Sequence, residues 1–293
     1  MTVEAFAPGK LILMGEHAVV YGHPALAIAV NRGMRVRLHS RPGATGIDHS
    51  FADDPRLTEA LHRVLPVAGV GVEIESTLPI GRGMGSSAAL AVALGRASLK
   101  LEGKPVTSEA VNERAFAVER IFHGQPSGID HTVSMRGGAL LYNRTDIGPE
   151  FQRFELPDLP IVVIDSGSAG NTADMVRSVA ERIEDVRPYL DQISELLQNT
   201  KAALQKGDLV AIGQAWHENH WLLRAIGVST PTLDKIVRVA AESGATGAKL
   251  AGAGGGGVVI ALAPNPGPLL VAAKQNGWDA FEVRQNESDE NQR

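Results

Sequence analysis

The feature that most constrains this chain is a glycine-rich stretch at residues 78–90, Leu-Pro-Ile-Gly-Arg-Gly-Met-Gly-Ser-Ser-Ala-Ala-Leu. Glycines occupy alternate positions, two serines follow them, and the alanine-rich run that continues to Leu94 predicts a buried helix. Glycine lets a ligand approach the backbone closely. A helix N-terminus offers unpaired N–H groups and roughly half a positive charge. The stretch therefore predicts a phosphate-holding loop. An ordinary glycine-rich turn with a serine cap is the alternative.

Two better-known phosphate loops do not account for this stretch. The pattern G-x-x-x-x-G-K-[ST] occurs nowhere in the chain. A G-x-G-x-x-G spacing occurs at Gly252, Gly254 and Gly257, but residues 258–262 after it read as a strand. A dinucleotide-binding fingerprint requires a helix at that place, so this match is weak.

Composition excludes several classes of protein. With 293 residues and 44% hydrophobic content, the chain can bury a sizeable core and is expected to form two domains. The net charge of −5 argues against a general binder of nucleic acid or of anionic membranes. The absence of cysteine removes disulfides and thiolate chemistry. No apolar run approaches the roughly 20 residues that span a bilayer, and the N-terminus has no targeting pattern, so we expect a cytoplasmic protein.

The order of apolar segments predicts an α+β chain. Residues 3–7 and 10–13 read as strands separated by Pro8 and Gly9, and the polar segment 146–160 reads as a connection. Beyond it, helical patterns are followed by short strands. We therefore expect a first domain over residues 1–155 and a second over residues 156–293.

Several charged residues are candidates for chemistry. Lys10, Glu16 and His17 lie between apolar strands, where a charge is costly unless it is exposed or paired. The alternative for each is an ordinary surface residue, and for His17 taken alone that alternative is favoured. Glu119 and Asp130 flank a tight loop. Phosphoryl transfer needs cradled phosphates, a magnesium ion, a cationic side chain and a base near the acceptor hydroxyl. The chain offers a candidate for each, but from the residues alone a structural salt bridge or helix cap is the favoured explanation of the two carboxylates.

Three blocks together resemble a known family, the GHMP kinases. They are residues 7–22 (Ala-Pro-Gly-Lys-Leu-Ile-Leu-Met-Gly-Glu-His-Ala-Val-Val-Tyr-Gly), residues 79–89, and residues 249–257 (Lys-Leu-Ala-Gly-Ala-Gly-Gly-Gly-Gly). They occur in family order over nearly the whole chain. Within the family, residues 119–130 and 219–228 look like those of mevalonate kinases.

The resemblance implies a fold and a set of roles. The N-terminal domain should contain a ribosomal-protein-S5-like portion, and the C-terminal domain should be ferredoxin-like, with ATP between them. Asp130 would be the base toward the C5 hydroxyl of mevalonate, with Lys10 beside it, and Ser87 and Glu119 would bind Mg²⁺. The ATP phosphates would be held by Pro79, Ile80, Gly81, Arg82, Gly83, Met84, Gly85, Ser86, Ser87 and Ala88. The substrate end would be formed by Glu16, His17, Thr172, Gly254, Gly255 and Gly256. A homodimer is expected from the same resemblance.

The chain departs from the family at His131, where Asn is common after the base. A charged imidazolium there would favour the ionised form of Asp130, which predicts a mild shift of activity to the acid side. Alternatives to a mevalonate kinase are a sibling kinase for phosphomevalonate, homoserine or a sugar, a decarboxylase relative, and a non-catalytic ligand sensor. Because Asp130 and Glu119 are both present, the sensor is disfavoured.

A second site is conceivable at His217 and His220, which lie three residues apart on an expected helix. Such a pair can share a metal, but zinc usually requires a third ligand, and no partner motif is visible. A solvated or capping role is the expected one.

Overall fold

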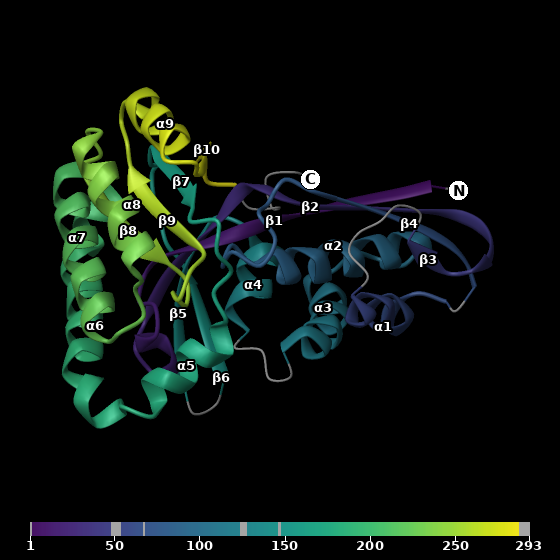
Figure 1. Ribbon diagram of the computed structural model, residues 1–293. Helices are drawn as coiled ribbons and strands as arrows, with labels where there is room; N and C mark the ends of the chain where they lie inside the picture. Colours follow the sequence, from purple (N-terminus) through teal and green to yellow (C-terminus); the bar gives the residue numbers. More distant parts are fainter. Residues whose placement is uncertain (1, 48–53, 67, 124–127, 146–147, 287–293) are drawn as a thin grey trace.

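The computed structural model describes residues 2–47, 54–66, 68–123, 128–145 and 148–286. Its strands form two sheets, and most helices pack against one or the other (Figure 1). This mixture of helices with largely antiparallel strands confirms the expected α+β class.

The first sheet has six strands in the order β3-β4-β2-β5-β6, with β1 pairing with β2 outside this path. Two long strands, β1 and β2, pair antiparallel from Thr2 opposite His39 to Met14 opposite Leu26. The strands are β1 (Thr2–Met14), β2 (Ala25–Ala44), β3 (Gly46–Ile47), β4 (Ala68–Ser76), β5 (Ala139–Thr145) and β6 (Gly148–Arg153).

Strand β1 runs through Pro8 and Gly9, where the sequence predicted a break. The strand tolerates Pro8 because its pairing with β2 shifts register between Pro8 and Lys10. At such a bulge the missing N–H of proline leaves no hydrogen bond of the ladder unmade. A Cβ on Gly9 would lie 2.9 Å from the carbonyl oxygen of Met84, so glycine at this position lets the glycine-rich loop approach β1.

Helices of the first half gather on one side of this sheet (Figure 1). Helix α2 is buried on nearly all sides, which explains why its sequence is apolar and rich in alanine rather than amphipathic. The helices are α1 (Pro55–Val64), α2 (Ser86–Leu101), α3 (Ser108–His123) and α4 (Ile129–Arg136), and a 3₁₀ turn, η1 (Ala18–Tyr21), follows β1.

The second sheet is antiparallel in the order β10-β7-β9-β8. Taken in chain order, its strands are arranged 4-1-3-2, with helices after the first and third, which is the ferredoxin-like arrangement implied by the family resemblance. Its elements are β7 (Ile161–Asp165), α5 (Thr172–Ala180), α6 (Ile183–Lys206), α7 (Leu209–Ala225), α8 (Pro231–Glu242), β8 (Gly247–Ala251), β9 (Val258–Leu262), α9 (Pro266–Gln275) and β10 (Asp279–Val283).

One apolar cluster joins the two sheets. It contains Leu11 of β1, Leu94 of α2, Val163 of β7 and Trp216 of α7, all fully buried. The end of the chain adds a backbone hydrogen bond from Asn31 to the carbonyl oxygen of Arg284. The two sheets are therefore packed on a shared core. Within the described residues, no helix combines the length and hydrophobicity needed to cross a membrane.

Candidate functional site

The glycine-rich loop ends directly at the N-terminus of α2. Its N-cap is Gly85, at φ 72°, and no side chain caps the helix. The Ser86 hydroxyl instead accepts a hydrogen bond of 3.4 Å from the N–H of Gly81. The serine cap that the sequence allowed is therefore wrong, and the N-terminus of α2 presents no side-chain cap to an anionic ligand.

Lys10 of β1 connects this loop to Asp130. Its Nζ lies 3.2 Å from Asp130 Oδ1 and donates a hydrogen bond of 3.1 Å to the carbonyl oxygen of Gly83. A Cβ on Gly85 would lie only 2.9 Å from Lys10 Cγ, so the loop can pass this close because the residue is glycine. Lys10 is 4% exposed, whereas the Asp130 side chain is 39% exposed. The pair thus places a buried cation behind a carboxylate that a ligand can reach.

Asp130 lies in the first turn of α4, a helix that the sequence did not predict. The segment around it reads as a loop because of its glycines, and α4 has only eight residues with no clear amphipathic period. From this first turn the carboxylate reaches to 3.2 Å from Lys10 Nζ.

Glu119 lies near the end of α3, 3% exposed, beside the same group. Burial, and then the charge of Asp130, raises its pKa from 4.5 to about 7, although a hydrogen bond with Ser87 and the charge of Lys10 oppose this rise. Its Oε1 is buried and has no hydrogen-bond partner among the described residues. A carboxylate oxygen that is buried and has no hydrogen-bond partner is suited to bind a cation.

These residues fit a magnesium ion held mainly by a ligand. The described residues contain no group of three His, Cys, Asp or Glu side chains that could hold a metal by themselves. Mg²⁺ in kinases, however, is commonly bound by one or two protein oxygens together with substrate phosphates and water. Glu119 and Ser87 could supply that number of ligands beside the N-terminus of α2.

His131 does not carry the charge that the sequence-based hypothesis required. Burial lowers its pKa, so the imidazole is neutral near pH 7. Its Nε2 lies 3.1 Å from Oδ1 of Asn112, which can only accept, so the ring donates this hydrogen bond. The ring edge also contacts Phe116, with centroids 5.8 Å apart. The structure therefore removes the reason to expect an acid-side shift from an imidazolium.

A second glycine loop, at residues 252–257, lies against the first. A Cβ on Gly83 would lie 3.5 Å from the carbonyl oxygen of Ala251, and one on Gly257 would lie 2.9 Å from that of Arg82. Arg82 also forms an ion pair with Asp165 at the end of β7, with Nε 3.2 Å from Oδ2. Asp165 was not among the residues predicted from the sequence, where its position after the apolar strand 161–164 was its only signal.

Glu16 and His17 form the turn after β1, and both are buried. Burial lowers the pKa of His17, so its ring is neutral, and Nε2 lies 2.8 Å from the carbonyl oxygen of Ala253. Because a carbonyl only accepts, the ring donates Nε2–H, and Nδ1 is left as an acceptor. Glu16 was expected at the substrate end, but its carboxylate is engaged by Lys249 and Asn219.

The remaining substrate candidates lie around the second glycine loop. A Cβ on Gly254 would lie 2.1 Å from the carbonyl oxygen of Val228, so only glycine fits there. Gly255 donates its N–H to the same carbonyl at 2.8 Å, and a Cβ on Gly256 would lie 2.7 Å from the carbonyl oxygen of Ser168. Thr172 is the first residue of α5 and is exposed.

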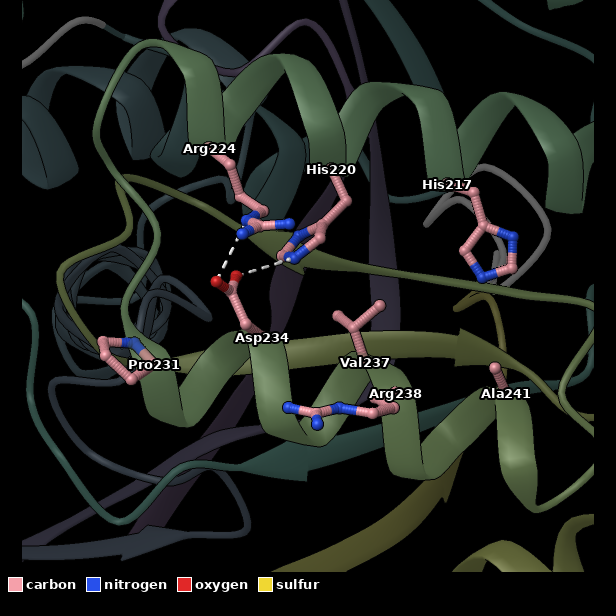
Figure 2. Close-up of a pocket in the computed structure, with 8 residues that line it drawn as sticks. All are labelled: His217, His220, Arg224, Pro231, Asp234, Val237, Arg238 and Ala241. Carbon is pink, nitrogen blue, oxygen red and sulfur yellow. Dashed lines mark hydrogen bonds and ion pairs between the residues drawn. The ribbon is translucent and has the colours of Figure 1, made fainter.

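The histidine pair of α7 lies elsewhere, in a groove of about 520 Å³ between α7 and α8. Figure 2 shows His220 and Arg224 converging on Asp234, whereas His217 lies over Ala241 rather than beside His220. The Nε2 of His220 and the Nε of Arg224 lie 3.1 and 3.0 Å from Asp234. The pair therefore does not form a shared metal site, and His220 instead links α7 to α8.

Two family models match the chain. The model for the N-terminal domain of GHMP kinases matches residues 55–138, and the model for their C-terminal domain matches residues 200–276. Among curated relatives, the mevalonate kinase of Thermococcus sibiricus is 37% identical, over 90% of this chain and 90% of its own length. The mevalonate kinase of Archaeoglobus fulgidus is 36% identical, over 88% of this chain and 91% of its own.

Solved structures agree with these matches. A crystal structure of L. major mevalonate kinase in complex with R-mevalonate is 29% identical, with a TM-score of 0.86 over 97% of this chain and 96% of that one. Mevalonate kinase from methicillin-resistant Staphylococcus aureus is 27% identical, with a TM-score of 0.74 over 96% and 98% of the two chains. The chain belongs to the GHMP kinase family.

Proposed function

We propose that this chain transfers the γ-phosphoryl group of ATP to the C5 hydroxyl of mevalonate, giving 5-phosphomevalonate and ADP. The observation that carries the proposal is the meeting of Lys10, Asp130 and Glu119 at the uncapped N-terminus of α2. The curated relatives named mevalonate kinase support the choice of acceptor.

Asp130 is the proposed base. As the hydroxyl oxygen of the acceptor attacks the γ-phosphorus, the bond from that phosphorus to the oxygen of ADP breaks, and the hydroxyl proton passes to the Asp130 carboxylate. Lys10, at 3.2 Å from that carboxylate, stabilises the negative charge that develops on the attacking oxygen. The buried position of Lys10 strengthens this effect, because the surroundings screen the charge poorly.

The loop at residues 79–88 is the proposed phosphate site, with the N-terminus of α2 directed at the ligand. Glu119 and Ser87 are the proposed protein ligands of Mg²⁺, supported by the unpartnered Oε1 of Glu119. When bound, the ion would neutralise charge on the phosphate oxygens. Without a cation, the carboxyl of Glu119 is about half protonated near pH 7, so loading of the site and loss of that proton are coupled.

The substrate end is proposed at His17 and at the loop containing Gly254, Gly255 and Gly256, with Thr172 on the neighbouring α5. Because Nε2–H of His17 is used by Ala253, its free Nδ1 suits a hydroxyl of the acceptor better than a carboxylate. The contact between the two glycine loops supports a cleft shared by both sheets. Glu16 was also expected here, but its buried carboxylate is bound by Lys249 and Asn219.

The test is a coupled ADP-release assay with Mg-ATP, in which mevalonate, 5-phosphomevalonate, homoserine and galactose are offered in parallel. We expect turnover with mevalonate, reduced about 100-fold or more in Asp130→Asn. Turnover with another acceptor would replace mevalonate by a sibling substrate, and no turnover with any of them would contradict the enzyme assignment.

Two organisational features are part of the same proposal. We propose a first domain over residues 1–155 and a second over residues 156–293, supported by the separate strand sets of the two sheets. Limited proteolysis should then cleave first near residues 154–160. A homodimer stays a prediction, which light scattering coupled to gel filtration tests.

A further inference from the structure

A fully buried ion pair lies beside the proposed substrate end. Lys249 of β8 is 0% exposed and Glu16, in the turn after β1, is 1% exposed, and Lys249 Nζ donates a hydrogen bond to Glu16 Oε1. The same Nζ donates a second bond, of 2.7 Å, to the carbonyl oxygen of Leu250. Two charges removed from water at this depth require a reason, because an apolar pair of similar volume would often be as stable.

Asn219 of α7 completes the cluster. Its Nδ2 donates a hydrogen bond of 3.2 Å to Glu16 Oε2, while its own Oδ1 is buried with no partner among the described residues. An apolar side chain would leave no such orphan, so the contact with Glu16 is the evident use of this asparagine. Helix α7 can lie this close to β8 because Gly213 and Gly247 meet, where a Cβ on either would be 2.3 Å or less from the opposite backbone.

The cluster holds the residue next to His17. Among the described residues, His17 is the non-glycine residue with positive φ, at φ 59° and ψ −46°. This backbone conformation is costly for a residue with a Cβ, and persists only where the surroundings impose it. Restraints lie on either side of it: Lys249 and Asn219 each hold one carboxylate oxygen of Glu16, and the His17 ring is hydrogen-bonded to the carbonyl oxygen of Ala253.

We propose that Lys249 and Asn219 are positioning residues, which act through Glu16 to hold the strained turn that aims His17 at the acceptor substrate. Glu16 is then a support for the site rather than a substrate contact. The inference about acceptor binding rests on the proposed function. The geometry of His17 itself does not, because it can be measured without any substrate.

Substitution of Lys249 or Asn219 should weaken binding of the acceptor substrate and leave binding of ATP nearly unchanged. The cluster contacts the turn at residues 16–17, whereas the proposed phosphate site lies in residues 79–88, where Lys10 donates hydrogen bonds to the carbonyl oxygens of Gly83 and Met84. A loss of general stability would instead impair both substrates alike. The ratio of the two KM values therefore separates positioning from simple folding support.

The variants are Lys249→Met, Asn219→Leu and the double variant Glu16→Gln with Lys249→Met. Lys274→Met, at an exposed position of α9, is the matched control. Lys249→Met leaves a buried carboxylate unpaired and can fail to fold, whereas the double variant buries no charge at all. We expect the double variant and Asn219→Leu to raise the KM for mevalonate about tenfold, with the KM for ATP changed less than about twofold.

A double-mutant cycle tests the route through His17. In a His17→Ala background, Asn219→Leu should raise the KM for mevalonate less than about twofold further, because the group that it positions is already gone. Equal effects of Asn219→Leu in both backgrounds, or equal rises in both KM values, would overturn the proposal.

NMR of the ligand-free protein tests the position of His17 independently of any kinetic measurement. The imidazole ring resonances of His17 should shift in the double variant and not in Lys274→Met, while those of His62 on α1 stay in place. Unchanged His17 resonances would overturn the positioning role even if the kinetics changed. If the wild-type protein fails to phosphorylate mevalonate while the His17 resonances shift, the proposed function is wrong and the positioning of His17 stands.

Discussion

Glu119→Gln should stabilise the metal-free protein at alkaline pH while abolishing its activity. The folded protein raises the pKa of Glu119 from 4.5 to about 7, chiefly because the carboxyl is buried. Between these values the folded state keeps a proton that the unfolded state has released, so stability falls as pH rises. At about 1.4 kcal/mol per pKa unit, roughly 3 kcal/mol is present below pH 4.5 and is lost once pH has risen through 7.

Glutamine does not ionise, so the variant should not show this loss. Urea unfolding in EDTA at pH 5 and pH 8 measures the free energy of unfolding of both proteins, and the advantage of Glu119→Gln should grow by about 2–3 kcal/mol between the two pH values. Glu109→Gln, at an exposed carboxylate in the first turn of the same helix, is the control and should show no such growth. A constant difference between Glu119→Gln and wild type would refute the argument that burial holds the proton.

Three further predictions follow from the same contacts. Mg²⁺ binding should release a proton from Glu119, so affinity should fall about tenfold from pH 8 to pH 6, measured by calorimetry in two buffers; equal affinity at both would contradict the assigned ligand. Arg82→Gln and Asp165→Asn should show a coupling of about 1 kcal/mol in a double-mutant cycle of unfolding, and strict additivity would mean that their ion pair contributes nothing. Burial lowers the pKa of His220 to about 4 in the folded protein. As pH falls below 6.5, this histidine is therefore protonated in the unfolded chain while it is still neutral in the folded one. Relative to His220→Gln, wild type should therefore lose about 2 kcal/mol between pH 7 and pH 4.5 in urea unfolding, and parallel pH curves would contradict this.

The sequence was most informative where chemistry constrains the backbone. The loop at residues 79–88 and the helix after it could be predicted, because alternate glycines followed by an apolar run suit few other structures. The class of fold was also predictable from the order of strands and helices.

What could not be predicted depends on contacts between distant segments. The unbroken β1 requires β2 to absorb a register shift at Pro8, and α4 is stabilised by packing rather than by its own weak pattern. The neutral state of His131 follows from burial that no local pattern reveals.

The contact between Lys249 and Glu16 is indicated in the sequence by one feature. Lys249 lies within the apolar run Ala-Lys-Leu-Ala, and a lysine inside a strand buried on both faces needs an opposite charge nearby. The partner, more than 200 residues earlier in the chain, could be identified only from the fold.

Single-turnover phosphoryl transfer is the most direct test of the account, measured by rapid quench with radiolabelled ATP, excess enzyme, Mg²⁺ and mevalonate. Asp130→Asn keeps the size of the side chain but cannot take the proton, so its transfer rate should fall about 100-fold or more, while ATP affinity changes less than about twofold. An unchanged transfer rate would show that Asp130 is not the base and would contradict the arrangement of Lys10, Asp130 and Glu119 as a phosphoryl-transfer site.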